Sequence, residues 1–408
     1  MVGRVKKILI IGCGGAGMFS AIVAAQLKPG TFKVTVLSDE KDIFCRCTTP
    51  YILSKKAELR EAIQPDKMIQ QYGVELIHDP AIHINPYLKH VLTESGEQYT
   101  YDNLVIATGA RPHIPAIKGI DQKHVVPVRS SEDIKHIEKY VKKRKHAIVI
   151  GGGVIGVETA AALRERGMNV SLLEGQKQLI PGTTDPEFAH KFLNLLEKKG
   201  VAVHLSSCAE IINKNTVSIK IGKKTKRLKA DLVVIATGVI PNVELAKESG
   251  IRVGKNGIVV DNKMRTNFKD IYSCGDCVTT KSIITGKSGG NRLASSAIQQ
   301  AKIVGYQLAG FPMHYHGHTG SFGFQIFDKE YACAGLSEVE ARKQHHHLVM
   351  IGHAKTTDKY KDLKEHESLE VKLIFAGIRF RLVGAAAYGK GVATPIEVAS
   401  LAMGEHLS

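Results

Sequence analysis

The stretch KILIIGCGGAG, residues 7–17, decides the fold of this chain. An apolar run of isoleucine and leucine enters a glycine loop, and the alanine-rich segment 18–27 that follows is typical of a helix. In such a loop the first glycine makes a tight turn, the second lets the backbone approach a pyrophosphate, and the third lets helix and strand pack closely. The start of the helix then offers free N–H groups to the phosphates. The stretch therefore predicts a strand, a turn and a helix that bind a dinucleotide.

The same design returns at residues 147–156, AIVIGGGVIG, where a second helix-like run follows. Two further segments match each other, because apolar strand-like runs end in Ala107-Thr108-Gly109 and in Ala236-Thr237-Gly238. This repetition predicts an α/β fold with two Rossmann-like, three-layer nucleotide-binding domains, one inserted in the other. The loop positions expected to hold the two dinucleotides are Gly12, Gly14, Gly15, Ala16 and Gly17 in the first copy, and Gly151, Gly153, Val154, Ile155 and Gly156 in the second.

An acid at the end of the second strand of each unit should bind the ribose hydroxyls. In the second copy the run 169–173 ends at Glu174, and no arginine follows to hold a 2′-phosphate, so NADH is favoured over NADPH. In the first copy the corresponding strand ends at Ser38, and we assign the ribose to the next acid, Asp39.

Composition limits the classes of function. At 408 residues the chain should form two or three domains, and we expect no membrane span and no signal peptide. Seven cysteines in a chain of this size do not suggest a disulfide framework, so a reducing, cytoplasmic setting is expected. The formal charge of +17 favours anionic ligands or partners. Nucleic-acid binding is not expected, because no aromatic residues interleave with the basic runs at 142–145 and 223–227.

The chain changes character from about residue 311. Strands are predicted at 321–327, 369–375 and 380–385, and helices near 337–343 and 395–403, which together indicate a short α+β module. Before it, a strand ends at Gly275-Asp276 and a helix is predicted over 293–308.

Both glycine loops, both Ala-Thr-Gly segments and Gly275-Asp276 together resemble the FAD-dependent pyridine nucleotide–disulfide oxidoreductases. The resemblance implies an FAD-binding domain at 1–114 and 242–311, an NAD(H)-binding domain at 115–241, and a dimerisation domain at 312–408. It also implies that Asp276 hydrogen-bonds FAD, that Glu158 lies beside the nicotinamide, and that the protein is a homodimer.

The redox cysteine distinguishes the branches of this family. The Cys-x4-Cys pair of the glutathione reductases is missing, and Cys274-x-x-Cys277 spans the flavin motif instead of standing in the nicotinamide domain. The segment Cys47–Tyr51, with its Pro-Tyr ending, resembles the single-cysteine branch of coenzyme A-disulfide reductases, NADH oxidases and NADH peroxidases. The first glycine loop has no histidine of the kind that the peroxidases and water-forming oxidases place there, which favours chemistry on sulfur.

The predicted function is thus transfer of electrons from NADH through FAD to Cys47, which reduces a disulfide, polysulfide or persulfide such as coenzyme A disulfide. The thiolate is the working nucleophile, and Arg46 and a helix that begins near Thr48 could lower its pKa. Cys45 departs from the family pattern: it could bridge to Cys47, or face away as a bystander. Coenzyme A as a bound partner of Cys47 is left open.

Tyr360 is a candidate active-site tyrosine that one subunit donates to the other, because the chain stops at Ser408 without the tail that carries this tyrosine in the family; the alternative is a plain surface residue. Cys13, Cys208 and Cys333 are expected to be buried. No metal site is predicted, although histidines cluster at 314–318 and 345–347.

Three alternative functions stay open. The chain could be an NADH oxidase or peroxidase, or an NADH:rubredoxin-type reductase of an electron carrier. It could also be a redox-responsive NADH-binding flavoprotein without turnover that interacts with an anionic partner.

Overall fold

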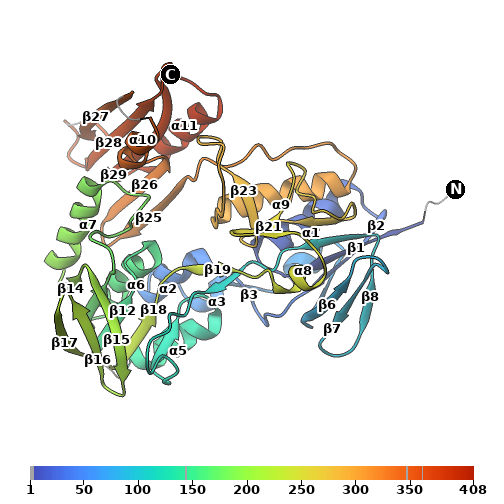
Figure 1. Cartoon of the computed structure of the whole chain (residues 1–408), viewed down its shortest axis with the longest axis horizontal. Coiled ribbons are helices and arrows are strands. Elements are labelled where there is room, and N and C mark those ends of the chain that lie inside the picture. The colour runs from blue at the N-terminus through green and yellow to red at the C-terminus, as the bar shows by residue number, and fades with distance from the viewer. Residues whose placement is uncertain (1–3, 143–144, 346–347, 361) are drawn as a thin grey trace. The chain divides into compact units, whose positions relative to one another are not determined.

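The structure is a computed structural model that describes residues 4–142, 145–345, 348–360 and 362–408 (Figure 1). Contacts divide the chain into two compact units. Unit 1 comprises residues 1–47, 60–111 and 239–318, and unit 2 comprises residues 48–59, 112–238 and 319–408. The domain limits predicted from the sequence stay predictions.

Unit 1 is built on a parallel five-stranded sheet in the order β22-β9-β1-β2-β5. Its strands are β1 (Lys6–Ile11), β2 (Phe32–Leu37), β5 (Val74–Ile77), β9 (Asn103–Ile106) and β22 (Ile271–Ser273). The last four residues of β1 are buried, as expected for a strand covered on both faces. Because Ile11 pairs with Leu37 and with Ile106, the loops after β1, β2 and β9 meet at the same edge of the sheet.

Two long helices of unit 1 pack on each other, α1 (Gly15–Leu27) and α9 (Ala294–Leu308). A Cβ built on Gly305 would lie 2.5 Å from a methyl carbon of Val23, so the absence of a side chain at Gly305 sets their close approach. Both helices confirm the predictions, with shifts of three residues and one residue at their starts.

The smaller elements of unit 1 form short pieces around this sheet. They are β3 (Ile43–Phe44), η1 (Arg46–Thr48), α3 (Leu59–Ala62), β4 (Ile63–Gln64), α4 (Lys67–Gln70), β6 (Ala81–Asn85), β7 (His90–Thr93), β8 (Gln98–Thr100), β10 (Ala110–Pro112), β19 (Val239–Pro241), α8 (Glu244–Glu248), β20 (Val253–Gly254), β21 (Gly257–Val259), β23 (Val278–Lys281) and β24 (Ser288–Gly289).

Unit 2 repeats the parallel design in the order β11-β18-β12-β13-β14. The strands are β11 (Val125–Pro127), β12 (His146–Ile150), β13 (Asn169–Leu173), β14 (Val201–His204) and β18 (Leu232–Ile235), and the helices are α2 (Thr49–Leu53), α5 (Ser131–Val141), α6 (Val154–Glu165) and α7 (Pro186–Lys198). Ile150 pairs with Leu173 and with Ile235, as Ile11 pairs with Leu37 and Ile106 in unit 1. The internal repeat seen in the sequence is therefore a repeat of sheet register.

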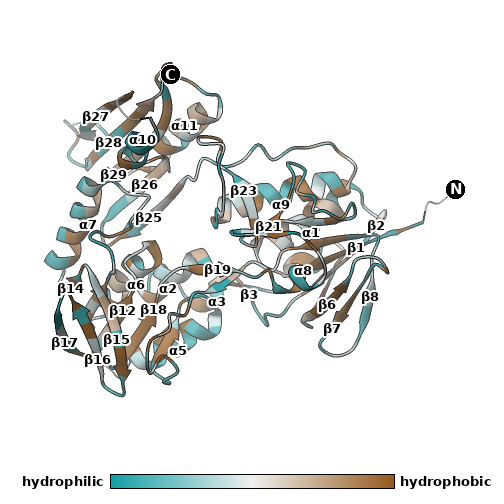
Figure 2. Cartoon of the chain, in the orientation of Figure 1, coloured by the Kyte–Doolittle hydropathy of each residue, from teal (hydrophilic) through white to brown (hydrophobic). Residues whose placement is uncertain are grey.

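Unit 2 also holds a three-stranded antiparallel sheet and the C-terminal α+β module. The first contains β15 (Ser207–Asn213), β16 (Thr216–Ile221) and β17 (Lys224–Lys229); the second contains β25 (Phe322–Ile326), β26 (Lys329–Gly335), β27 (Val349–Thr357), β28 (Ser368–Ala376), β29 (Arg381–Gly389), α10 (Glu338–His345) and α11 (Ala393–Gly404). The three predicted C-terminal strands and both helices are confirmed, while β26 and β27 were not predicted. The apolar residues concentrate in the strands of the sheets (Figure 2).

Candidate functional site

The first glycine loop brings helix α1 against the end of strand β1. Gly12 has φ +101, and a Cβ on it would lie 2.3 Å from the carbonyl oxygen of Ala107. A Cβ on Gly17 would lie 1.8 Å from the carbonyl oxygen of Gly12. No described atom comes within 4 Å of a Cβ built on Gly15. The loop is thus closed on its protein side and open on the side where the N–H groups of α1 begin.

The flavin motif of the sequence contacts this loop directly. A Cβ on Gly275 would lie 2.7 Å from the Cβ of Ala16, and the Gly275 N–H donates to the side-chain oxygen of the fully buried Gln300 at 2.8 Å. Asp276 therefore follows a backbone turn that is fixed beside the start of α1. The first turn of α1 contains no acidic residue, so nothing from the helix itself competes with a bound phosphate there.

The second loop reproduces the same contacts in unit 2. A Cβ on Gly151, which has φ +111, would lie 2.4 Å from the Ala236 carbonyl oxygen, and a Cβ on Gly156 would lie 1.7 Å from the Gly151 carbonyl oxygen. Gly153 caps helix α6 and is open. Val154 and Ile155 form the first turn of α6. The two loops are thus structural copies.

The Ala-Thr-Gly segments support the loops from behind. Ala107 and Ala236 supply the carbonyls over the first glycine of each loop. The Thr108 hydroxyl donates to the Asn242 carbonyl at 2.8 Å, and the Thr237 hydroxyl donates to the His113 carbonyl at 2.6 Å. The following glycines, Gly109 and Gly238, both have positive φ.

Glu174 is held rigidly at the second loop. One of its carboxylate oxygens accepts from the Gly152 N–H at 2.7 Å, and the other accepts from the Gln176 N–H at 2.7 Å. A Cβ on Gly152 would lie 2.8 Å from the Cβ of Glu174, so the acid needs a glycine at this loop position. The carboxylate is preorganised by two backbone donors and keeps further acceptor capacity for ribose hydroxyls.

The first loop has a different pair at the equivalent positions. Cys13 stands where Gly152 stands, and Ser38 stands where Glu174 stands, because the registers of the two sheets match. Ser38 is buried, and its hydroxyl donates to the Glu40 carbonyl at 3.0 Å. Without a carboxylate at position 38 there is room for the cysteine side chain. Asp39 is exposed on the same turn.

Arg46 connects this turn with the first loop, a link that was not predicted. Its Nη2 pairs with Glu40, and its Nη1 lies 3.6 Å from the Cβ position of Gly14. Its Nε is buried without a hydrogen-bond partner in the described part of the chain. The positive charge of a guanidinium is repelled by the positive end of the helix dipole. An anion bound between the two would remove this repulsion. The only sequence signal was one basic residue before Cys47.

Cys45 and Cys47 are both exposed. The backbone N–H of Cys45 donates to the Ala62 carbonyl at 2.8 Å, and Cys47 lies in η1, just before α2. Helix α2 has only five residues, so its dipole contributes little to a thiolate at its start. The guanidinium of the neighbouring Arg46 has its described contacts with Glu40 and near Gly14.

Most other cysteines are shielded from chemistry. Cys274 and Cys277 have no exposed surface, and burial raises the pKa of both thiols. Burial likewise raises the pKa of Cys13 and of Cys333 to about 12. Cys208 was predicted to be buried, and this prediction is wrong: the thiol is exposed on β15, whose alternate side chains face away from the core.

Glu158 lies on α6 within a mainly apolar environment. Burial raises its pKa to about 8, and the backbone N–H of Gln325 opposes this shift by hydrogen bonding to the carboxylate. Burial raises the pKa of the Tyr51 hydroxyl on α2, and the charge of the nearby Glu158 raises it further. The segment that follows Cys47 thus contacts the helix of the second loop inside unit 2.

One acidic cluster among the described residues has the spacing of a metal site, but a lysine occupies it. Among the described residues, Asp185, Glu187 and Glu338 come close enough together to hold a cation. The Nζ atom of the buried Lys372 already lies 2.9 Å from Asp185 and 2.7 Å from Glu338. Burial alone would lower the pKa of Lys372, but hydrogen bonds to the three acids raise it above its ordinary value. A permanent ammonium therefore fills this position.

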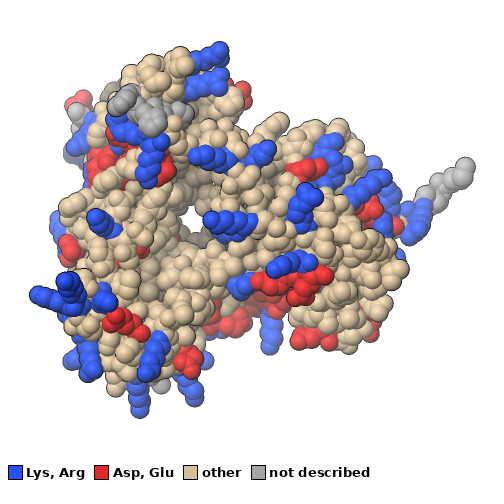
Figure 3. All heavy atoms as spheres, viewed as in Figure 1, with Lys and Arg blue, Asp and Glu red and all other residues tan. Residues whose placement is uncertain are grey.

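The structure gives no special environment to the other positions named in the sequence analysis that it describes. Tyr360 is exposed. The pair His346–His347 and the basic pair at 143–144 lie outside the described residues. Lysine and arginine are spread over the visible face in Figure 3 without one dominant patch. No helix in the described ranges is both long and apolar enough to span a membrane.

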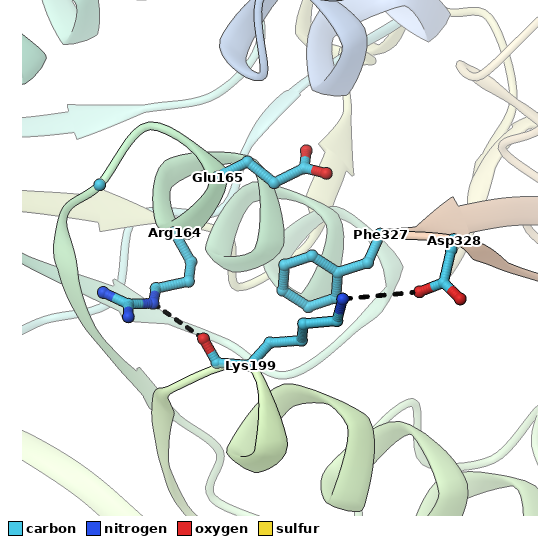
Figure 4. Close-up of a pocket in the computed structure, with 6 residues that line it drawn as sticks. Arg164, Glu165, Lys199, Phe327 and Asp328 are labelled. Carbon is cyan, nitrogen blue, oxygen red and sulfur yellow. Dashed lines mark hydrogen bonds and ion pairs between the residues drawn. The ribbon is translucent and has the colours of Figure 1, made fainter.

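A cavity of about 480 Å³ lies elsewhere in unit 2 (Figure 4). Its lining residues satisfy one another: Arg164 donates through Nε to the Lys199 carbonyl at 2.8 Å, and the Lys199 Nζ lies 3.9 Å from Asp328 and 5.5 Å from the ring centre of Phe327. Glu165, which also lines the cavity, pairs with Lys56 outside it at 3.0 Å. The charged groups of the cavity thus have partners within the protein.

Two glycine loops with this geometry are typical of a protein that binds two dinucleotides. Residues 6–301 match the pyridine nucleotide-disulphide oxidoreductase family and residues 322–408 match the dimerisation domain of the same family. The chain belongs to this family.

Known relatives cover nearly the whole chain. An NADH oxidase of Methanocaldococcus jannaschii is 32% identical over 98% of this chain and 92% of its own length. The NAD(P)H coenzyme A polysulfide/persulfide reductase of Pyrococcus horikoshii is 32% identical over 83% of this chain and 78% of its own length. The structure of a NAD-dependent persulfide reductase from A. fulgidus has a TM-score of 0.93 at 30% identity, with 98% of this chain and 77% of that chain covered. The chain is thus an enzyme of the group that contains coenzyme A-disulfide reductases, NADH oxidases and persulfide reductases.

Proposed function

We propose that the chain is an NADH-dependent reductase of small sulfur compounds, namely a disulfide, a polysulfide or a persulfide such as coenzyme A disulfide. The observation that carries this proposal is the exposed thiol of Cys47, which follows Arg46 in the chain while the thiols beside the flavin motif are buried. The names of two relatives, a polysulfide/persulfide reductase and a persulfide reductase, support it.

The residues of unit 1 fit FAD. The open space over Gly15, the free start of α1 and the orphaned Nε of Arg46 suit a pyrophosphate, and Asp276 stands beside them. When bound, FAD supplies a relay that takes two electrons from a nicotinamide and passes them to sulfur. We assign the adenosine ribose of FAD to Asp39, which is exposed on the turn after β2.

The residues of unit 2 fit NADH. The fixed carboxylate of Glu174 can accept hydrogen bonds from both ribose hydroxyls, and its charge disfavours a 2′-phosphate. We therefore propose NADH as the preferred donor over NADPH. Glu158, one turn into α6, is proposed to face the nicotinamide.

The step on sulfur belongs to Cys47. Its thiolate attacks one sulfur of the substrate, a Cys47–sulfur bond forms, the substrate S–S bond breaks, and the second sulfur leaves as a thiolate that takes up a proton. Two electrons from NADH then reduce the mixed disulfide and release the second product thiol. Arg46 is proposed to stabilise the thiolate at both ends of this cycle.

Three finer points belong to the same proposal. Cys45 either forms an internal bridge with Cys47 or stays a bystander. The protein acts as a homodimer in which Tyr360 of one subunit reaches the site of the other. An exposed nucleophilic thiol suits the cytoplasm, where thiols stay reduced.

The test is turnover of the holoenzyme with several acceptors in parallel. With NADH as donor, we expect coenzyme A disulfide or polysulfide to be reduced at least roughly tenfold faster than oxygen or rubredoxin, and NADPH to be the poorer donor. Fast oxygen consumption without sulfur turnover would instead support an NADH oxidase, the function named for the M. jannaschii relative. Fast reduction of rubredoxin alone would support an electron-carrier reductase.

The raised pKa of Glu158 gives a prediction for pH. Because its pKa is about 8, the carboxyl stays protonated at pH 7. Glutamine resembles this neutral form, so the rate at which NADH reacts with the Glu158→Gln variant should lie within about twofold of the wild-type rate. The unfolded chain loses this proton near pH 4.3, so burial makes the wild type less stable as the pH rises toward 8. The stability of Glu158→Gln relative to wild type should therefore grow by on the order of a few kcal/mol between about pH 5 and 8 and then stay level. Denaturant titrations at several pH values measure this; a difference that stays flat with pH contradicts it.

A further inference from the structure

The chain passes from one compact unit to the other beside the exposed thiol. Cys47 is the last residue of the first stretch of unit 1, and Thr48 is the first residue of unit 2. The stretch 48–59 keeps its contacts within unit 2 before the chain returns to unit 1 at Arg60. The backbone that carries Cys47 is therefore tied, by one peptide bond, to whatever holds helix α2.

Helix α2 is not stable on its own. Five residues are too few for a stable isolated helix, so its place is set by what it packs against. Ile52 and Leu53 are almost completely buried, and the contacts of α2 run to α6 and α5. The apolar contacts fix the face of α2, and backbone N–H groups of residues 54–57 bond the carbonyls of Pro50, Tyr51 and Ile52. The carbonyl of Leu53, the last residue of α2, is left to a side chain.

Arg166 bonds this last carbonyl of α2. Its Nη1 donates to the Leu53 carbonyl at 3.0 Å and to Glu138 Oε1 at 2.7 Å, and its Nη2 donates to Glu138 Oε2 at 3.4 Å. The side chains of Arg166 and Glu138 are each only 15% exposed, so this pair is shielded from solvent more than an ordinary surface pair. Arg166 directly follows α6, the helix of the second glycine loop.

Two weaker ion pairs fasten the residues after α2. Lys56 lies 3.0 Å from Glu165, and Lys55 lies 3.7 Å from Glu138. Both lysine side chains are nearly half exposed, and pairs of this kind add little by themselves. Arg166 is thus the central polar contact of a clamp formed by Arg166, Glu138, Glu165 and the segment 48–56.

We infer that Arg166 is a positioning residue for Cys47: it holds α2 on the helix that begins at the second glycine loop, and through α2 it fixes the backbone from which the thiol projects. This inference rests on the proposed role of Cys47 as the redox cysteine. Helix α6, which begins at the proposed NADH loop, then also helps to position the redox cysteine. Arg166 does this without contact to either nucleotide loop.

The chain offers a matched control on the same helix end. Arg164 also donates two hydrogen bonds to carbonyls, to Lys199 at 2.8 Å (Figure 4) and to Met168 at 3.1 Å. No hydrogen bond from Arg164 to α2 is found among the described residues. Arg164→Gln should therefore cost comparable local stability without moving α2. Arg166→Lys retains the charge but cannot serve Leu53 and both oxygens of Glu138 together, so it should lie between wild type and Arg166→Gln.

The experiment compares Arg166→Gln, Arg166→Lys and Arg164→Gln as purified holoenzymes. Rapid mixing with NADH follows flavin bleaching, and mixing the reduced enzyme with a disulfide follows its reoxidation. For Arg166→Gln we expect bleaching within about twofold of wild type and reoxidation slower by roughly 10- to 100-fold, with Arg164→Gln normal in both. Equal effects of Arg166→Gln and Arg164→Gln, or equal losses in both steps, would overturn the inference.

A second readout does not depend on turnover. The rate at which iodoacetamide modifies Cys47 in the reduced protein, resolved by peptide mass analysis, should change at least roughly tenfold in Arg166→Gln, while the exposed Cys208 reacts at its wild-type rate. An unchanged Cys47 rate would refute the positioning role. If Cys47→Ser keeps full turnover, the proposed function fails, and the alkylation rates still decide whether Arg166 positions residue 47.

Discussion

Replacing Cys47 with serine is expected to reduce disulfide or persulfide turnover by roughly a thousandfold or more, while NADH still bleaches the flavin at the wild-type rate. Serine keeps the size of the side chain, but its hydroxyl is a far weaker nucleophile than a thiolate and cannot form a bond that two electrons reopen. The two glycine loops, which are the proposed sites of NADH and FAD, are left untouched by the change. The measurement is steady-state turnover with a sulfur acceptor beside rapid mixing with NADH alone.

Cys45→Ser is the control for this change. If Cys47 works alone or with a substrate thiol, Cys45→Ser should keep turnover within about threefold of wild type, because Cys45 is then a bystander. If the two cysteines form a resolving bridge, both variants should lose turnover. Intact mass before and after reduction separates the cases further: a bound coenzyme A is released as a large mass, whereas an internal bridge gains only two hydrogens. Full turnover by Cys47→Ser would show that the thiol is not the electron acceptor.

The general architecture could be predicted because it depends on local rules. A glycine loop between an apolar strand and a helix has few physical solutions, and the two copies in this chain exclude a side chain in the same way. A Cβ would lie 2.3 and 2.4 Å from a carbonyl oxygen at the first glycine of each loop, and 1.8 and 1.7 Å from one at the last. The acid at Glu174 could be predicted for the same reason, since the strand that precedes it ends at a fixed register.

The pairs that distinguish the two loops could not be predicted in this way. Cys13 looked like an arbitrary residue inside the first loop, and only the contact between Gly152 and Glu174 shows why a side chain fits at position 13 when Ser38 replaces the acid. The proximity of the Arg46 guanidinium to Gly14 could not be predicted, because no spacing in the sequence encodes it. Cys208 was placed wrongly because a small apolar residue on a strand can face either side.

The support of Cys47 is also a property of packing. The sequence predicts a helix that begins near Thr48, but it gives no reason why this helix should contact α6 and α5. Arg166 and Glu138 stand far from Leu53 in the chain and meet it only in the folded unit. Long-range contacts of this kind decide which unit a short helix belongs to, because the helix contributes too little stability of its own.

The largest structural effects are expected from alanine at the last glycine of each loop. A Cβ at Gly17 would lie 1.8 Å from the carbonyl oxygen of Gly12, and a Cβ at Gly156 would lie 1.7 Å from that of Gly151. Neither overlap can be relieved by a side-chain rotation, because the opposing atom belongs to the backbone. In each variant the helix must move away from its strand, and the N–H groups that would hold a pyrophosphate move with it.

The two variants should therefore lose different functions from nearly the same overlap. Gly17→Ala should be purified with less than roughly a tenth of the wild-type FAD, since the proposed site of the flavin is the first loop. Gly156→Ala should keep FAD, but its reduction by a fixed NADH concentration should slow by roughly a hundredfold or more, while dithionite still reduces it. Flavin absorbance per protein and rapid mixing with NADH measure the two losses, and circular dichroism checks that both variants are folded. Because the clashes are matched, a general loss of stability would affect both variants alike. The assignment of the loops fails if Gly17→Ala retains stoichiometric FAD, or if NADH reduces Gly156→Ala at the wild-type rate.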